Sequence, residues 1–170
     1  HTLAQEIATT QDIPPYIAVW IFVTALPAQS VFGVASMTMS AVVTLFALGQ
    51  VYVSVTGTYL FIDSYVPAAV FLGMHLLFTD PSTAPRTELG RILFGGLYAL
   101  SVAGLYVWLA SVGAPTFSDK LLAVPVLNLT IQALDRVARS DALKRFNPAN
   151  IGAMLAPRRR HLVYMLVWAI

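Results

Sequence analysis

The sequence predicts an all-α protein, a polytopic transmembrane helix bundle with about five to six spans. Three observations lead to this fold class. First, 58% of the 170 residues are hydrophobic and only 11% are charged, with a mean hydropathy of +0.74. Second, long apolar runs alternate with short polar breaks, and a bilayer core of about 30 Å needs roughly 20 apolar residues per helix. Third, all ten Lys and Arg residues follow residue 85. Such asymmetry is typical of membrane proteins, whose short cytoplasmic loops retain basic residues.

Each element follows from an apolar run and the residues that interrupt it. Pro15 and Pro67 suit the first turn of a helix, and Gly113 followed by Pro115 suits the end of one. The third run is short for a full crossing, so we expect its helix to be tilted or to end inside the protein. In chain order, we expect spans over residues 16–31, 37–62, 67–78, 91–112 and 121–134, and the start of another at 161–170.

These elements divide the chain into three parts. Residues 1–134 form the transmembrane bundle, 135–160 a basic cytoplasmic linker, and 161–170 the beginning of a further transmembrane helix. The chain begins at His1 rather than Met and stops within an apolar run, so we expect it to be part of a longer protein.

The basic residues also predict an orientation. Nine of the ten, all except Lys120, fall on one side of the expected spans, which we interpret as the cytoplasmic side of a bacterial inner membrane. The N-terminus of this segment, acidic and without basic residues, then lies outside, and so does the polar turn at Asp119 and Lys120. The net charge is only +2 and the basic residues flank apolar spans, so we expect contacts with lipid rather than nucleic acid. Cys is absent, which excludes disulfides and thiolate chemistry within these residues.

The most distinctive stretch is the loop from Phe78 to Pro85 and the segment Gly90–Gly95 that follows it. Thr79 and Asp80 can cap a helix or bond their own backbone. An ionisable group near the membrane is a functional candidate, because burying it is expensive. The alternative is a turn carboxylate at a helix end, paired with Arg86 or Arg91.

With these motifs, the chain resembles the NqrB/RnfD family. Its members are membrane subunits of sodium-pumping NADH:quinone oxidoreductases and of Rnf-type electron-transport complexes. The T-D-P-x-T-x-P loop before G-R-x-x-F-G carries the resemblance, and Gly113–Pro115, Ala123–Asn128 and Leu134–Arg136 form a weaker second block. The family-like region covers about residues 66–139. The resemblance implies a helix bundle that carries electrons through flavins, coupled to movement of sodium ions or protons.

The resemblance also implies a covalent FMN, held by a Ser/Thr-Gly-Ala-Thr motif upstream of the loop. That motif is absent from these residues. The nearest string, Thr56-Gly57-Thr58, falls within a predicted span, and we interpret it as helix-packing residues. The attachment site either precedes His1 or has been lost, so the FMN is assigned to no residue.

Other polar residues in the apolar runs each have two interpretations. His75 could ligate a haem iron or a pigment magnesium, or bond a neighbouring helix. Asn128 could line a polar path with Asp80, or make an interhelical hydrogen bond. The run Arg158-Arg159-Arg160 could anchor the last helix or bind lipid head groups. No metal ligand set and no self-contained active site is visible in the sequence.

We therefore expect an integral-membrane subunit of a multi-subunit electron-transport complex, which scaffolds redox transfer and contributes to ion translocation. Thr79, Asp80, Arg91 and Asn128 are its candidate ion-path residues. The alternative is a non-catalytic accessory subunit that packs within a larger respiratory or photosynthetic assembly. A solute transporter, suggested only by interrupted helices, is a third hypothesis.

Overall fold

The computed structural model describes residues 17–61, 68–148 and 157–169, and the elements in these ranges are helices. The all-α class is thus confirmed there. In chain order they are α2 (Ile17–Phe32), α3 (Ala35–Thr56), α4 (Ala68–Leu72), the π-helix η1 (Gly73–Leu77), α5 (Glu88–Ser111), the 3-10 helix η2 (Thr116–Ser118), α6 (Asp119–Asn128), α7 (Ile131–Ala138), α8 (Asp141–Lys144) and α10 (Pro157–Ala169).

Two helices, α3 and α5, are long and apolar enough to cross a membrane, and α6 with α7 adds a third if this bent pair is one span. The predicted count of five to six is therefore not confirmed in the described residues. The outer faces fit a lipid solvent: large apolar side chains are exposed along the helices, up to 79% for Val55 and 86% for Leu129. The helices and their surface support an integral membrane protein.

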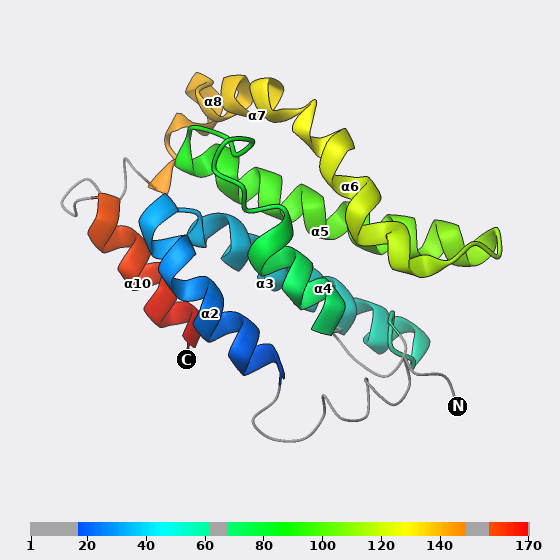
Figure 1. Cartoon of the computed structure of the whole chain (residues 1–170). Helices are drawn as coiled ribbons and strands as arrows, with labels where there is room; N and C mark the ends of the chain where they lie inside the picture. The colour runs from blue at the N-terminus through cyan, green and yellow to red at the C-terminus, as the bar shows by residue number, and fades with distance from the viewer. Residues whose placement is uncertain (1–16, 62–67, 149–156, 170) are drawn as a thin grey trace.

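The centre of the fold is the pair α3 and α5, which run side by side in the same direction (Figure 1). Small residues bring them together. Gly95 lies against the carbonyl oxygen of Met37, and the Ser40 hydroxyl donates to the Ile92 carbonyl at 2.6 Å. Close approach at small residues with interhelical hydrogen bonds is how helices associate in lipid, where no hydrophobic force drives them together.

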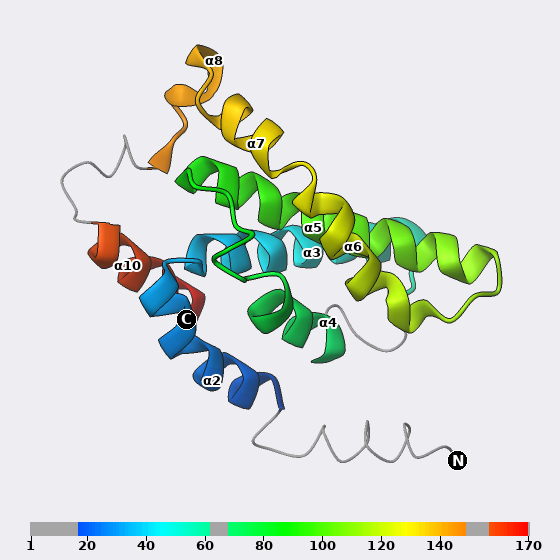
Figure 2. The same ribbon diagram turned by 45° about the horizontal axis from the view of Figure 1, so that its top comes forward.

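The remaining helices cover this pair on two sides (Figure 2). Helices α2, α4 and α10 lie on one side, and α7 and α8 lie on the other, with α6 packed along α5. Parallel α3 and α5 require the chain between them to return, and α4 with η1 forms that return. Phe78, at its end, stacks on Tyr98 of α5 with ring centroids 4.3 Å apart. This contact fixes the position at which the following loop begins.

The structure corrects two predicted boundaries. Helix α3 ends at Thr56, where Gly57 takes a positive φ of 73° and donates its N–H to the Val53 carbonyl. The Thr56-Gly57-Thr58 string is therefore a helix end rather than mid-span packing, because Gly readily adopts the left-handed conformation that ends a helix. The predicted fifth span is broken by 63° between α6 and α7, after Asn128. Pro125 lies inside α6 without ending it.

The region after the bundle is partly helical. Helices α7 and α8 occupy the start of the predicted linker 135–160, and α10 begins at Pro157 rather than His161. The Arg158–Arg160 run therefore lies in the first turn of α10. The predicted domain boundaries remain predictions. The predicted outside N-terminal segment before residue 17 lies outside the described residues.

Candidate functional site at one end of the bundle

The loop that precedes α5 is held by one carboxylate from α7. Asp135 accepts hydrogen bonds from the Arg86 N–H at 3.0 Å, the Thr87 N–H at 3.0 Å and the Thr87 hydroxyl at 2.7 Å. The Thr87 hydroxyl oxygen in turn accepts the Gly90 N–H at 3.1 Å and so caps α5. Through these bonds the end of α7 is tied to the beginning of α5, although 48 residues separate Asp135 from Thr87.

The G-R-x-x-F-G segment owes its residue types to contacts at this same end. A side chain at Gly90 would meet the Thr87 hydroxyl and, at 3.0 Å, the Asp135 carboxylate. Arg91 donates from Nε to the Pro85 carbonyl at 2.9 Å and from Nη1 to the Gly33 carbonyl at 2.7 Å. Phe94 stacks on Phe78. The segment therefore joins the start of α3, the loop and the start of α5.

The predicted loop residues Thr79 and Asp80 have different environments. Thr79 is buried, and its hydroxyl donates to the His75 carbonyl at 2.9 Å, which closes the end of η1. Asp80 is exposed and accepts from the N–H and hydroxyl of Ser82, at 2.9 and 2.7 Å. These two bonds, led by the hydroxyl, hold the pKa of Asp80 below its ordinary value, so it is ionised at neutral pH. Within the described residues Asp80 forms an ion pair with neither Arg86 nor Arg91.

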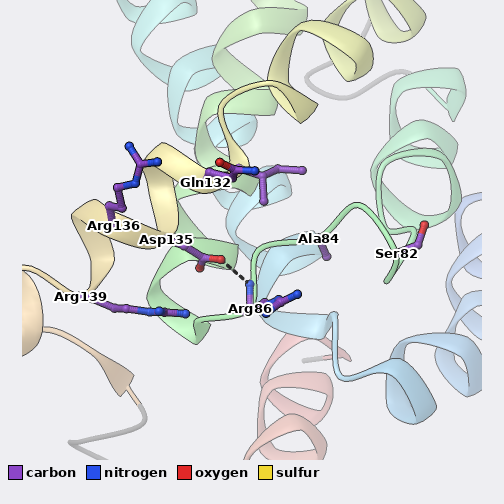
Figure 3. A pocket seen from close by; sticks show the side chains of 8 residues that line it. Ser82, Ala84, Arg86, Gln132, Asp135, Arg136 and Arg139 are labelled. Carbon is purple, nitrogen blue, oxygen red and sulfur yellow. Dashed lines mark hydrogen bonds between the residues drawn. The ribbon is translucent and has the colours of Figure 1, made fainter.

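A basic cavity lies between this loop and α7 (Figure 3). Its volume is about 480 Å³, and Arg86, Arg136 and Arg139 are among the side chains that line it. In the close view, Asp135 faces the loop backbone at Arg86, with Arg139 beside it and Arg136 extending from the same helix. Arg side chains are suited to a phosphate-bearing group, which a guanidinium can bind through two parallel hydrogen bonds, while Asp135 in the same lining adds a negative charge.

A buried acid ties α10 to the same end. Glu88, in the first turn of α5, pairs with Arg160 at 3.1 Å and accepts the Tyr164 hydroxyl at 2.6 Å. Among the residues predicted to bind lipid, Arg160 therefore has a protein partner, whereas Arg159 is exposed. The Arg158 side chain lies outside the described residues. A second open cavity, of about 500 Å³, lies beside Arg91 and His161.

The two remaining candidates, His75 and Asn128, lie within helices. His75 is buried in η1, with Nδ1 2.8 Å from the Phe71 carbonyl and its ring against Phe71 and Phe22. The described residues contain no group of three or more His, Cys, Asp or Glu side chains that could hold a metal. Asn128 is the last residue of α6, and its buried Oδ1 accepts no hydrogen bond in the part described. Hydrogen bonds thus join Thr79 to the backbone of His75 and Arg91 to the loop, whereas none joins the side chains of Asp80 and Asn128 in the part described.

Comparison with known proteins gives one partial similarity. The D subunits of the ion-translocating oxidoreductase complex from Escherichia coli (strain K12 / DH10B), Klebsiella pneumoniae (strain 342) and Citrobacter koseri are each 37% identical to this chain over 71 residues. The match covers 42% of this chain and 19% of each relative, so the chain spans less than a fifth of their length. No protein-family model and no solved structure matches the chain.

Sequence reasoning misses the acids that organise this end. Asp135 appears in the sequence only as part of a family-like block, and no motif includes Glu88. The signal for Glu88 is an acid in the first turn of an expected helix, where the helix dipole favours negative charge.

The sequence places Asp119 in an aqueous turn, yet it is fully buried. Its only sequence signal is an acid at the start of an apolar run.

Proposed function

We propose that this chain is part of an integral-membrane subunit of a multi-subunit, ion-translocating electron-transport complex of the NqrB/RnfD type. The observation that carries the proposal is the 37% identity over 71 residues to proteins named as the D subunit of such a complex. Two helices suited to crossing a membrane support it. The T-D-P loop motif supports it too, since that loop occupies a defined position at one end of the bundle.

In this proposal the basic end of the bundle faces the cytoplasm. Five arginines lie at this end. Arg86 and Arg91 form hydrogen bonds there, Arg160 forms an ion pair, and Arg136 and Arg139 line the same cavity as Arg86. Concentration of Arg at one membrane face is the expected signal for the cytoplasmic side. Anionic lipid and the other subunits of the complex are the partners that we propose for this surface.

The proposed ion path uses the four candidates from the sequence, which are Thr79, Asp80, Arg91 and Asn128. Asp80 is suited to the aqueous mouth of such a path, because it is exposed, ionised and close to the end of η1. Asn128 offers an oxygen with no donor within the described residues, near the bend between α6 and α7. Polar groups at helix breaks are where membrane proteins bind and pass ions.

The proposed function assigns no flavin to the residues of this chain. The FMN attachment motif is absent from these residues, and the hydroxyls of the nearest string are used within the end of α3. There the Thr56 hydroxyl donates to the Tyr52 carbonyl at 2.8 Å and lies 3.2 Å from the Thr58 hydroxyl. In this proposal the chain is a scaffold. Its helices, loop and charged groups hold the redox subunits in place.

The proposal is tested by purifying the full-length protein with its native partners in mild detergent. We expect redox subunits to co-purify, and electron-driven cation uptake into membrane vesicles to fall when the gene is deleted. Asp80→Asn should lower uptake per electron transferred and leave assembly intact, whereas Asp141→Asn, an exposed acid in α8, should change neither. If cation uptake is unchanged in the deletion strain and the complex still assembles, the chain has no part in ion translocation, and the alternative of an accessory subunit is favoured. Unchanged uptake in Asp80→Asn alone would remove that residue from the path.

A further inference from the structure

The start of α6 holds a buried ion pair that no part of the loop site uses. The Asp119 side chain is 0% exposed, and its Oδ1 accepts the Lys120 ammonium at 2.6 Å and the Lys120 N–H at 2.7 Å. Its other oxygen, Oδ2, is buried and receives no hydrogen bond within the described residues. A buried carboxylate oxygen with no donor is costly, so Oδ2 needs a hydrogen-bond donor or a cation in addition to Lys120.

The pair lies deep along α5 rather than at its end. The Tyr98 hydroxyl donates to the Lys120 carbonyl at 3.4 Å. Tyr98 is ten residues after Glu88 and thirteen before Ser111, the ends of α5. At about 1.5 Å per residue these intervals are roughly 15 and 20 Å, so Tyr98 is near the middle of this candidate span. The predicted outside turn at Asp119 and Lys120 is thus packed against mid-helix.

The backbone around the pair is irregular on both sides. Helix η1, where Phe78 donates its N–H to the Gly73 carbonyl five residues earlier, packs its Gly73 against the Tyr98 hydroxyl and close to Lys120. On the other side, the 3-10 helix η2 leads directly into α6. π-helical turns recur at functional sites, and interrupted backbone at membrane depth occurs where it is enclosed by protein or lines a polar cavity.

The two charged side chains differ in their exposure. The Lys120 side chain is 18% exposed, whereas the Asp119 side chain is fully buried. The elements packed here carry five other titratable groups, which are Glu88, Arg91, Tyr98 and Tyr106 on α5 and His75 on η1. Among them, Tyr98 contacts the pair through the Lys120 carbonyl. None of the five provides a second positive charge at Asp119 in the described contacts. If the ammonium leaves, another cation must take its place at the carboxylate, because an isolated charge in an apolar interior is very costly.

Stability alone does not explain such a pair. Replacing a buried ion pair by apolar residues of similar size is often neutral or stabilising, since desolvation offsets the attraction. Ionisable groups inside membranes mark ion or proton pathways by default. We propose that the Asp119 carboxylate is a membrane-embedded site for a monovalent cation, a proton or an alkali ion, which exchanges with the Lys120 ammonium. This deepens the proposed function and rests on it, because it names where a translocated cation would bind.

The test reads Asp119 directly and needs no electron transfer. Dicyclohexylcarbodiimide modifies carboxyl groups that take up a proton in apolar surroundings, and mass spectrometry of peptides locates the label. We would treat the full-length protein in its complex, in lipid nanodiscs, over a series of pH values. Sodium chloride is compared with choline chloride at equal ionic strength. The variants are Asp119→Asn, Lys120→Met and, as a matched control for an exposed acid, Asp141→Asn.

We expect label at Asp119 in the wild type and in Asp141→Asn, its loss in Asp119→Asn, and several-fold faster labelling in Lys120→Met. Slower labelling with sodium at constant pH identifies an alkali-ion site, and slowing by alkaline pH alone identifies a proton site. Absence of label from Asp119 in folded wild type at every pH, with label present after denaturation, would overturn the proposal and leave a fixed ion pair. The wild-type series decides even if Lys120→Met fails to fold. Failure of the cation-uptake assay with this label present would refute the proposed complex and not the site.

Discussion

Replacing Gly95 by Ala should destabilise the protein through a single contact between α3 and α5. An added methyl group would collide with the carbonyl oxygen of Met37. It would also lie 3.1 Å from the carbonyl carbon of Met37 and 3.2 Å from the Ala41 nitrogen. All three are backbone atoms, which cannot rotate away as a side chain can. The backbones of the two helices must therefore move apart at this contact.

The magnitude follows from two contributions. Overpacking of this kind costs about 1–3 kcal/mol. Separation also stretches the 2.6 Å bond from the Ser40 hydroxyl to the Ile92 carbonyl, and losing such a bond costs about 0.5–1.5 kcal/mol. The free energy of unfolding should thus fall by about 2–4 kcal/mol. For a chain of this size, 1 kcal/mol corresponds to about 2–4 °C in Tm, so we expect a fall of roughly 5–15 °C.

Gly104 provides a matched control on the same helix. An added methyl group there meets no atom within 4 Å. Gly104→Ala should therefore leave Tm unchanged or raise it slightly, because Ala favours a helix over Gly by up to about 1 kcal/mol. The assay is the loss of the monodisperse peak in size-exclusion chromatography after heating, on the full-length protein in detergent. If both variants lose this peak at the same temperature as the wild type, the close contact at Gly95 does not hold the two helices together.

Three further perturbations test the loop end. Asp135→Asn keeps the size of the side chain but exchanges an acceptor oxygen for an amide, so stability should fall by about 2 kcal/mol and protease should cut residues 79–87 sooner; cleavage at the wild-type rate would contradict this. In Arg91→Lys, one ammonium cannot reach the carbonyls of both Pro85 and Gly33, so the free energy of unfolding should fall by about 1 kcal/mol. A thermal melt measures this change, and an unchanged midpoint would show that one of the two hydrogen bonds suffices. Neutralising Arg136 and Arg139 to Gln should reduce the thermal stabilisation given by anionic phosphatidylglycerol over phosphatidylcholine, whereas equal stabilisation in both proteins would separate the cavity from lipid binding.

The helical class and the positions of most helices can be predicted because apolar runs and breakers are local signals. The predicted start of α5 at Arg91 lies within a single turn of the observed start at Glu88. The end of α3 escapes prediction because Gly57 lies within an apolar run, where only its left-handed conformation reveals the end. The bend after Asn128 escapes prediction because the one Pro of this run, Pro125, lies inside α6 and does not mark the break.

The candidate site is less predictable, because its organising contacts join residues far apart in the chain. The loop motif is recognisable, but the carboxylate of its most distinctive acid, Asp80, accepts hydrogen bonds only from Ser82 in the described contacts. The carboxylate that holds the loop, Asp135, comes from 48 residues beyond Thr87. No local pattern indicates such a pairing. In the same way, the polar sequence at Asp119 and Lys120 indicates a surface turn, and only packing against Tyr98 shows that the pair is enclosed.

The shared direction of α3 and α5 constrains how the protein can be inserted. Each is long and apolar enough to span a membrane, but the returning segment supplies, in α4 and η1, ten helical residues among those described, about 15 Å, against a core of about 30 Å. Its end is held in place only after α5 has been synthesised and Phe78 can stack on Tyr98. Biogenesis should therefore be ordered, with the long helices partitioning first and the short one settling between them afterwards. A ribosome-stalled chain ending before Tyr98 should leave this segment accessible to water-soluble reagents.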